Sequence, residues 1–267
     1  MSSPPSAVTS ERRGPLLLLR LNRPEARNAL NAELVAALHA EVATAQTDQG
    51  VRCIVLCGAG RAFSAGADLK ALQGMGTLSS EVNKADSQRL ADLLHLIYTG
   101  PKPVVAAVEG AAVAGGAGLA SACDLVVAGQ GARFGYTEVR LGFVAAIVMV
   151  FLLRCIGEKH ARELLLTGRL VSAQEAHRMG LINEVVLDGQ TEARALELAA
   201  EIAGASSTAL ASTREMLSLI PGMGLQEGLR YAVGMNAWTR TTSDLKEGVA
   251  AFLEKREPDW KVDSSDS

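Results

Sequence analysis

Hydrophobic residues in the first half of the chain gather in short continuous runs that are separated by glycine and polar residues. Apolar runs with such boundaries indicate strands that are buried on both faces. We therefore expect strands at residues 16–21, 51–56, 104–108 and 125–127. Apolar positions at helical spacing predict helices between these strands, at residues 31–45 and 87–98.

The segment beyond Gly157 changes to a helical pattern. Helices are predicted at residues 159–166, 172–179, 191–203, 207–219, 224–240 and 243–254. Ser172 with Glu175 forms a capping-box pattern, and Gly180 is a typical helix end. The order of strands, turns and helices predicts an α/β architecture with two regions. They are a core at residues 14–200 and a helical region at residues 201–267.

Composition narrows the class of protein. Of the 267 residues, 48% are hydrophobic and 21% are charged, which is typical of a globular chain that buries a large core. The net charge of −3 gives no reason to expect nucleic acid as a partner. Apolar runs such as residues 143–153 are too short for a membrane span.

Cysteine usage and the N-terminus bear on the compartment. The four cysteines form no CxxC pair and have no histidine at metal-ligand spacing, so we expect core packing and no metal site at Cys53, Cys57, Cys123 and Cys155. Residues 1–13 are rich in Pro and Ser and predict a flexible leader without the apolar segment of a secretory signal. These features indicate a reducing compartment, the cytoplasm, with the mitochondrial matrix as the alternative.

The candidate chemistry lies where the apolar run at residues 104–108 leads through glycines into a helix-compatible stretch. Gly115 and Gly116 have no side chain to keep a ligand away from the backbone, and the start of a helix favours negative oxygen. A second turn, around Gly66 and Ala67, also follows a β-type run. Two such turns can supply a pair of N–H donors to a developing oxyanion.

Four ordered motifs carry a family resemblance. They are LNRPEARNAL at residues 21–30, RAFSAGADLKAL at 61–72, KPVVAAVEGAAVAGGAGLASACDLVVA at 102–128 and ARFGYTEVRLG at 132–142. This combination resembles the crotonase superfamily, the enoyl-CoA hydratase/isomerase family, from about residue 14 to residue 260. The resemblance implies a crotonase-like spiral of ββα repeats with a C-terminal helical region. It also implies that these helices build trimer contacts, in a homotrimer or a dimer of trimers.

The resemblance further implies the catalytic positions. The amides of Ala67 and Gly115 would hold the enolate-like oxygen of an acyl-CoA thioester, and Glu138 would be the acid/base. Gly118 stands where two-glutamate hydratases of the family carry their other glutamate, so Glu138 would act alone. Ala146 stands where family dehalogenases and dienoyl-CoA isomerases carry an aspartate, which argues against those two reactions.

Three functions remain open. The first is a lyase that adds water to a 2-enoyl-CoA, which the likeness of AGGAGL with EVRLGFV to a hydratase branch favours. The second is a Δ3,Δ2-enoyl-CoA isomerase in which Glu138 shuttles the proton. The third is a catalytically weak CoA-binding or scaffolding member of the family, against which the presence of Glu138 argues.

CoA would be bound as part of the substrate, without a separate cofactor. The residues that the resemblance places beside it are Glu25, Ala26, Arg27, Ala65, Asp68, Lys70, Phe252 and Lys255. The last two would approach from a neighbouring helix or subunit. Residues 73–84 contain two glycines and several polar residues, and they predict a mobile loop over the site.

Overall fold

The computed structural model describes residues 6–260, without the side chain of Met75. Its largest sheet has six strands in the order β1-β2-β3-β5-β7-β10. These strands are β1 (Val8–Arg13), β2 (Leu16–Leu21), β3 (Cys53–Gly58), β5 (Val104–Val108), β7 (Leu125–Gly129) and β10 (Glu184–Val186). β1 is antiparallel to β2, and every other neighbouring pair is parallel. The four strands expected from apolar runs are all present.

A second sheet has four short strands in the order β4-β6-β8-β9. They are β4 (Ala62–Ser64), β6 (Ala111–Val113), β8 (Arg133–Gly135) and β9 (Val171–Ser172). β3, β5 and β7 of the large sheet are each followed by a strand of the small sheet and then by a helix. The chain therefore makes three successive ββα turns, which confirms the expected spiral of repeats.

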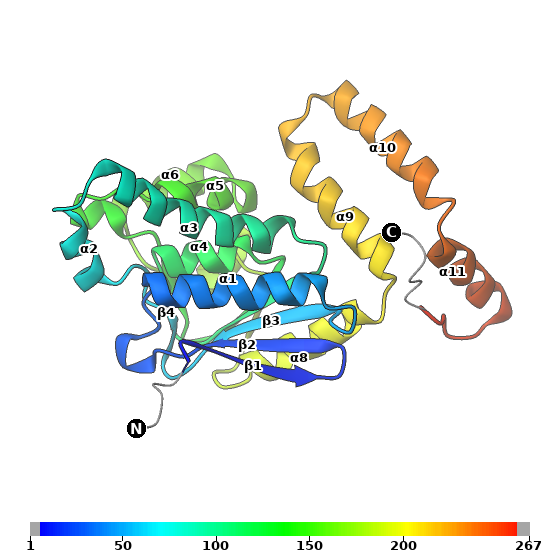
Figure 1. The fold of residues 1–267 in the computed structure, drawn as a ribbon, viewed down its shortest axis with the longest axis horizontal. Coiled ribbons are helices and arrows are strands. Elements are labelled where there is room, and N and C mark those ends of the chain that lie inside the picture. Colours follow the sequence, from blue (N-terminus) through cyan, green and yellow to red (C-terminus); the bar gives the residue numbers. More distant parts are fainter. Residues whose placement is uncertain (1–5, 261–267) are drawn as a thin grey trace.

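Helices cover both faces of the large sheet (Figure 1). One face packs against α1 (Ala32–Thr47), α3 (Ser80–Thr99), α4 (Gly115–Ala122) and α5 (Ala146–Cys155). The other face packs against α8 (Thr191–Ala203). Two further helices, α6 (Glu158–Thr167) and α7 (Ala173–Met179), follow α5. Burial on both faces explains why the central strands are almost continuously apolar in sequence.

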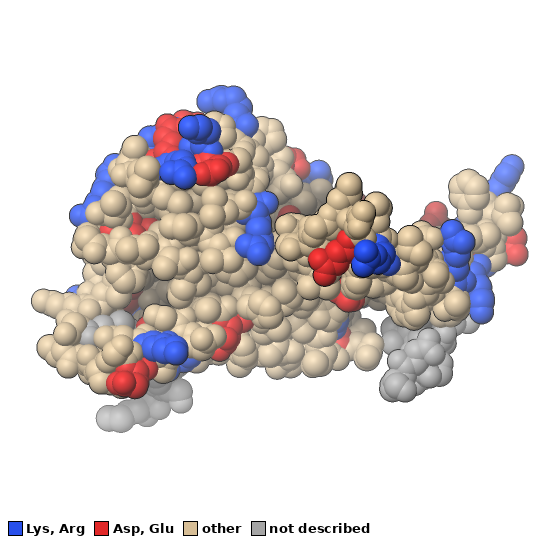
Figure 2. All heavy atoms as spheres, turned by 90° about the horizontal axis from the view of Figure 1, so that it is seen from above, with Lys and Arg blue, Asp and Glu red and all other residues tan. Residues whose placement is uncertain are grey.

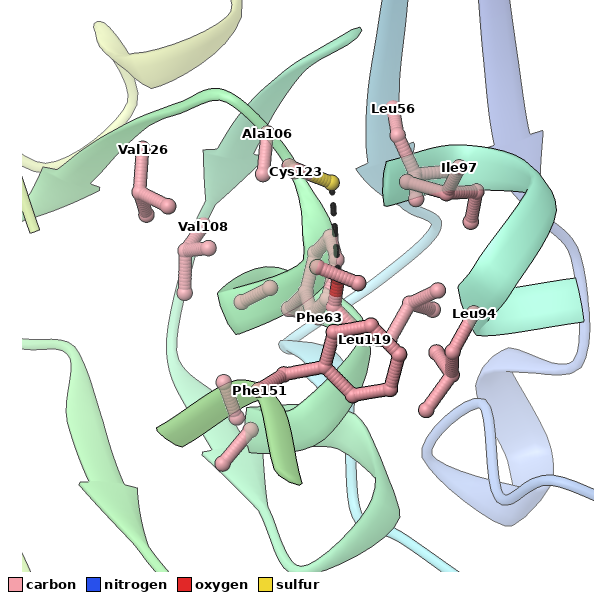
Figure 3. Packing of buried hydrophobic residues seen from close by; sticks show 14 of the residues in the cluster. Leu56, Phe63, Leu94, Ile97, Ala106, Val108, Leu119, Cys123, Val126 and Phe151 are labelled. Carbon is pink, nitrogen blue, oxygen red and sulfur yellow. Dashed lines mark hydrogen bonds between the residues drawn. The ribbon is translucent and has the colours of Figure 1, made fainter. Parts of the chain in front are cut away.

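The larger core cluster surrounds α4. Phe63, Leu119 and Phe151 come from three different elements and lie together in it (Figure 3). Cys123 donates its thiol to the Leu119 carbonyl (3.3 Å), and burial raises the pKa of this thiol. Cys53 and Cys57 share the opposite face of the sheet with α8, as their spacing in one strand predicts. All four cysteines are free thiols.

The C-terminal helices extend away from this core (Figure 1). They are α9 (Ser207–Leu219), α10 (Leu225–Thr239) and α11 (Ser243–Glu254). Arg214 of α9 links them to the core, because its guanidinium donates to Asp124 (2.8 Å) and to the Ile97 carbonyl (2.7 Å). The boundary expected at residue 200 falls inside α8, which packs on the sheet. We propose that the helical region begins after Ala203.

Two local predictions were wrong. The expected leader at residues 1–13 contains β1, which pairs with β2 from Val8 to Arg13, while residues 1–5 lie outside the described part. β1 is an edge strand with one buried residue, so it lacks an apolar run. The loop expected at residues 73–84 contains the end of α2 (Leu69–Met75) and the first turn of α3, which Ser79 caps. This turn of α3 is exposed and therefore shows no hydrophobic periodicity.

The surface carries charges of both signs. On the face that Figure 2 shows, the described Lys and Arg side chains are scattered among Asp and Glu and form no continuous basic patch. Among residues 6–260, no helix is both long enough and apolar enough to cross a membrane.

Candidate active site

Three parallel strands of the small sheet bring the predicted catalytic residues to one edge. β4 pairs with β6 through Ser64 and Ala112, and β6 pairs with β8 through Val113 and Gly135. Parallel strands end at the same edge of a sheet. The residues that follow these three strand ends are Ala67, Gly115 and Glu138.

The turns that carry the two predicted donors are in contact. Gly66 has φ +85°, and a Cβ placed on it would lie 2.7 Å from the Val113 carbonyl oxygen and 3.2 Å from the Gly115 nitrogen. A Cβ on Gly115 would in turn lie 3.9 Å from the Ala67 nitrogen. Glycine is therefore required at position 66 for the two turns to approach so closely.

The amides of Ala67 and Gly115 have no backbone hydrogen-bond partner among the described residues. The backbone of Leu30 bonds to the residues on either side of Ala67, because its N–H donates to Gly66 (2.7 Å) and its carbonyl accepts from Asp68 (3.0 Å). Within residues 6–260, neither the Ala67 nor the Gly115 N–H donates to a backbone carbonyl. Two free N–H groups side by side are what an oxyanion needs.

Ala114 fixes the direction of the second donor. It has φ +51° and ψ −122°, a conformation that residues with a Cβ rarely adopt, and it immediately precedes α4. Its N–H donates to the Gly135 carbonyl (2.7 Å), which ties the turn to β8. Gly115 is the first residue of α4, so its N–H adds to the partial positive charge of the helix start.

Glu138 is a buried carboxyl group. It begins a short 3-10 helix, η2 (Glu138–Leu141), and its exposed fraction is 7%. Its Oε2 is buried and has no hydrogen-bond partner among the described residues. Burial raises the pKa of Glu138 and outweighs a backbone hydrogen bond that lowers it. A buried carboxyl with a raised pKa is suited to act as a general acid or base.

The aromatic and apolar residues near Glu138 in sequence are only partly buried. Phe134 and Tyr136, which precede Glu138, are buried. Leu141 and Phe143, which follow it, are more than half exposed in the single chain. Near Glu138 in sequence, the residues before it are therefore buried and those after it are exposed in the single chain.

Gly118 lies one helical turn after Gly115 and faces α5. A Cβ on Gly118 would lie 2.1 Å from Cγ1 and 2.5 Å from Cβ of Val148. Val148 is itself buried. A glutamate at position 118 would have to displace α5, so Val148 occupies the space in which a second carboxylate would begin.

Most of the predicted CoA-binding residues lie together beside this edge. Glu25 and Ala26 belong to the 3-10 helix η1 (Pro24–Ala26), and the Arg27 carbonyl accepts from the Ala65 N–H (2.9 Å). Asp68 caps α2, in whose first turn Lys70 is exposed.

Asp68 is already engaged within the chain. Its carboxylate pairs with Arg23 (3.1 Å) and accepts from the backbone at the start of α2. Burial tends to raise the pKa of Asp68, but the bonds to Arg23 and to the backbone together lower it. Asp68 is therefore ionised and holds the turn that follows Ala67.

Phe252 and Lys255 do not join the other predicted CoA residues. Both are exposed at the end of α11, which lies at the opposite end of the molecule from α2 (Figure 1). Phe252 lines a cavity of about 470 Å³ between α9 and α11. Within one chain they cannot reach the same ligand as Arg27 and Lys70, so their role stays a prediction for an assembly.

Sequence reasoning missed buried residues that support the candidate site without belonging to it. Asn28 is fully buried, donates to the Ala59 and Ala62 carbonyls and accepts from the Arg23 N–H, so it fixes the start of β4. Its position inside LNRPEARNAL was a usable signal, since a polar residue among apolar neighbours needs partners. Val148 had no such signal, because its role depends on the packing of two helices.

A buried carboxyl and two amides without backbone partners follow neighbouring strand ends of a spiral of ββα turns, and this arrangement defines a class of α/β protein suited to acyl-thioester chemistry. A family model described as enoyl-CoA hydratase/isomerase matches residues 11–263. The chain therefore belongs to the enoyl-CoA hydratase/isomerase family, and it is an enzyme of that family.

Relatives cover nearly the whole chain. It is 52% identical over 246 residues to a protein of Thermus thermophilus provisionally named an enoyl-CoA hydratase, covering 92% of this chain and 97% of the relative. It is 38% identical over 257 residues to the 2,3-dehydroadipyl-CoA hydratase of Escherichia coli, covering 96% and 99%. The crystal structure of an enoyl-CoA hydratase from Polaromonas sp. JS666 superposes with a TM-score of 0.91 at 35% identity, covering 95% and 99%. These matches confirm the crotonase fold.

Proposed function

We propose that this enzyme is a hydro-lyase that adds water across the double bond of a 2-enoyl-CoA thioester. The observation that carries the proposal is the buried, unpartnered carboxylate oxygen of Glu138, which follows β8 at the sheet edge where the strands before Ala67 and Gly115 also end. The names of several relatives support the same reaction, since they are hydratases of CoA thioesters.

The reaction requires the protein to remove a proton from water, to stabilise an enolate and to return the proton to carbon. Glu138 takes a proton from water as the oxygen forms a bond to the β-carbon, and the electron pair of the double bond moves toward the thioester carbonyl. The amides of Ala67 and Gly115 stabilise the resulting enolate oxygen. Glu138 then returns the proton to the α-carbon. The hydroxyl group on the β-carbon and the hydrogen on the α-carbon both come from one water molecule, and no redox step occurs.

The packing of Val148 against Gly118 favours isomerisation as a second candidate. With no carboxylate at position 118, one acid/base group serves the site. A single carboxylate can remove a proton from the α-carbon of a 3-enoyl-CoA and return it to the γ-carbon, which moves the double bond. A purely CoA-binding or scaffolding role has less support, because a buried carboxyl with one unpartnered oxygen costs folding free energy that binding alone does not require.

The test uses Glu138→Gln, which keeps size and shape but cannot exchange a proton at neutral pH. General acid–base help is worth roughly a hundred to ten thousandfold, so kcat should fall by about that factor while binding of an acyl-CoA changes little. The exposed Glu158 of α6 offers a matched control, and Glu158→Gln should keep full activity. Hydration is followed with a 2-enoyl-CoA and isomerisation with a 3-enoyl-CoA.

The two assays separate the candidates. Hydration that is lost in Glu138→Gln supports the lyase, and activity on the 3-enoyl-CoA alone supports the isomerase. Binding of CoA without either activity in the parent protein supports the scaffolding role. Full activity of Glu138→Gln in both assays removes Glu138 from the mechanism.

CoA would be carried as part of the substrate. We propose that its contacts come from the backbone and cations around Arg27, Ala65 and Lys70, with Phe252 and Lys255 contributed within a homotrimer or a dimer of trimers. A cytoplasmic location, with the mitochondrial matrix as the alternative, stays a prediction.

A further inference from the structure

Tyr136 makes a buried hydrogen bond that links the two halves of the proposed site. Its hydroxyl lies 2.7 Å from Oγ of Ser121, and both side chains are buried. Tyr136 stands two residues before Glu138, and Ser121 lies in α4, which begins at Gly115. One bond therefore joins the segment that carries the carboxyl group to the helix that carries an oxyanion donor.

This polar pair stands inside an apolar cluster. Tyr136 has no exposed surface and belongs to the same core as Leu119 and Phe134. Burial raises the pKa of the Tyr136 phenol above its usual range, so the hydroxyl stays protonated and able to donate. Two apolar side chains could fill this space, but they would not supply the directional contact that the pair adds to the backbone bond from Ala114 to Gly135.

Ser121 also reaches a third element. Its carbonyl accepts from the Cys155 thiol at the end of α5 (3.4 Å), the helix whose Val148 packs against Gly118. Beyond Glu138, by contrast, η2 turns outward with Val139, Arg140 and Leu141 exposed. The Glu138 carbonyl accepts from the Phe143 N–H (3.0 Å), so the backbone holds Glu138 from the far side, while the Tyr136 side connects it to α4.

We propose that the Tyr136–Ser121 hydrogen bond positions the Glu138 carboxyl relative to the amides of Ala67 and Gly115, so that Tyr136 and Ser121 are positioning residues for catalysis. The inference rests on the function proposed above. Its physical basis is that turnover is sensitive to small displacements of a reacting group, with about 1 Å costing roughly a hundredfold. The same displacement changes substrate binding much less.

The test is a cycle of Tyr136→Phe, Ser121→Ala and the double variant. Each single change leaves one buried hydroxyl without its partner, whereas the double change removes both. The urea midpoint should therefore fall in each single variant and recover at least partly in the double variant. If the bond positions Glu138, kcat should fall roughly 10- to 100-fold in all three variants, with KM little changed.

Two controls make the result specific. Tyr98 packs edge-on against Phe151 in the same core, with ring centroids 5.5 Å apart, so Tyr98→Phe removes a hydroxyl elsewhere and should keep kcat. Glu138→Gln is measured in parallel. If it keeps full activity, the proposed role of Glu138 fails, independently of Tyr136.

The proposal is overturned if kcat recovers with stability in the double variant, because the bond would then be purely structural. It is also overturned if Tyr136→Phe, folded by circular dichroism, keeps the parent kcat. That variant deletes a single oxygen atom and decides the question even if the double variant does not fold.

Discussion

At the scale of single residues, two positions cost folding free energy: Glu138 through its burial and Ala114 through its backbone conformation. Glu138 is a carboxyl group without a partner for one of its buried oxygens. Ala114 has a backbone conformation that favours glycine. Both lie at the sheet edge where the candidate site is formed, and such costs persist where a site requires them.

The first prediction concerns the pH dependence of stability at Glu138. Burial raises its pKa in the folded state above the unfolded value of about 4.3. Its contribution to the free energy of unfolding is therefore fully present below the unfolded pKa and is lost as the pH rises through the folded pKa. The glutamine of Glu138→Gln does not titrate and has no such dependence. As the pH rises, the free energy of unfolding of the variant should therefore increase relative to that of the parent, by about 1.4 kcal/mol for each unit by which the pKa of Glu138 is raised.

Urea unfolding at a series of pH values measures this gain. A difference between variant and parent that does not change with pH would show that the carboxyl is solvated in the folded protein.

The second prediction concerns Ala114. Strained conformations of this kind cost about 1–3 kcal/mol, and glycine relieves them while losing about 0.5–1 kcal/mol through its greater unfolded freedom. Ala114→Gly should thus raise the free energy of unfolding by about 1 kcal/mol. As a control, Ala36→Gly in the exposed face of α1 should lower it by about the same amount. A destabilised Ala114→Gly variant would contradict the strained conformation.

At the scale of elements, the contact between α4 and α5 decides what the site can contain. Helices approach closely where one of them presents glycine, and here Gly118 meets Val148. The absence of a side chain at position 118 is therefore a packing requirement as well as the loss of a carboxylate.

The third prediction tests this packing. Gly118→Ala should destabilise the protein by about 1–3 kcal/mol, because its Cβ would overlap Val148. Val148→Gly removes the obstructing atoms, so the double variant should be less destabilised than the sum of the two single variants by at least about 1 kcal/mol. Gly234 of α10 has open space around a Cβ, and Gly234→Ala should be neutral or stabilising. Additive costs in the double variant would exclude the contact.

At the scale of the whole molecule, the C-terminal helices expose a large apolar surface. On α10, Leu225, Leu229 and Val233 recur every four residues and are 81%, 58% and 69% exposed. Residues at this spacing lie on one face of a helix. A face of this kind is typical of a surface covered by another subunit.

The fourth prediction follows from the proposed assembly. The parent should sediment as a trimer or a dimer of trimers, and Leu229→Lys should shift it toward smaller species, because a charge in an apolar interface is costly. Glu227 lies on the opposite side of α10 and is exposed, so Glu227→Lys should leave the assembly unchanged. A parent that sediments as a monomer would contradict the proposal.

Much of the fold could be predicted from the sequence because its signals are local. The apolar run of β5 and the helical spacing of α8, α9 and α11 gave the observed elements with the same boundaries. The caps at Ser172 and Gly180 are also local, and both are present. β1 and the first turn of α3 escaped prediction because they are exposed and therefore have no hydrophobic periodicity.

The sequence by itself determined which residues could do chemistry. It contains two glycine-rich turns, the motif around Glu138 and a glycine at position 118, and each of these features lies within a short continuous motif. The tertiary structure alone decided which of them meet. Parallel pairing of β4, β6 and β8 brings Ala67, Gly115 and Glu138 to one edge, while Phe252 and Lys255 remain at the other end of the chain. Val148 and the Tyr136–Ser121 bond were invisible in the sequence, because contacts between distant segments depend on packing geometry, which local patterns do not encode.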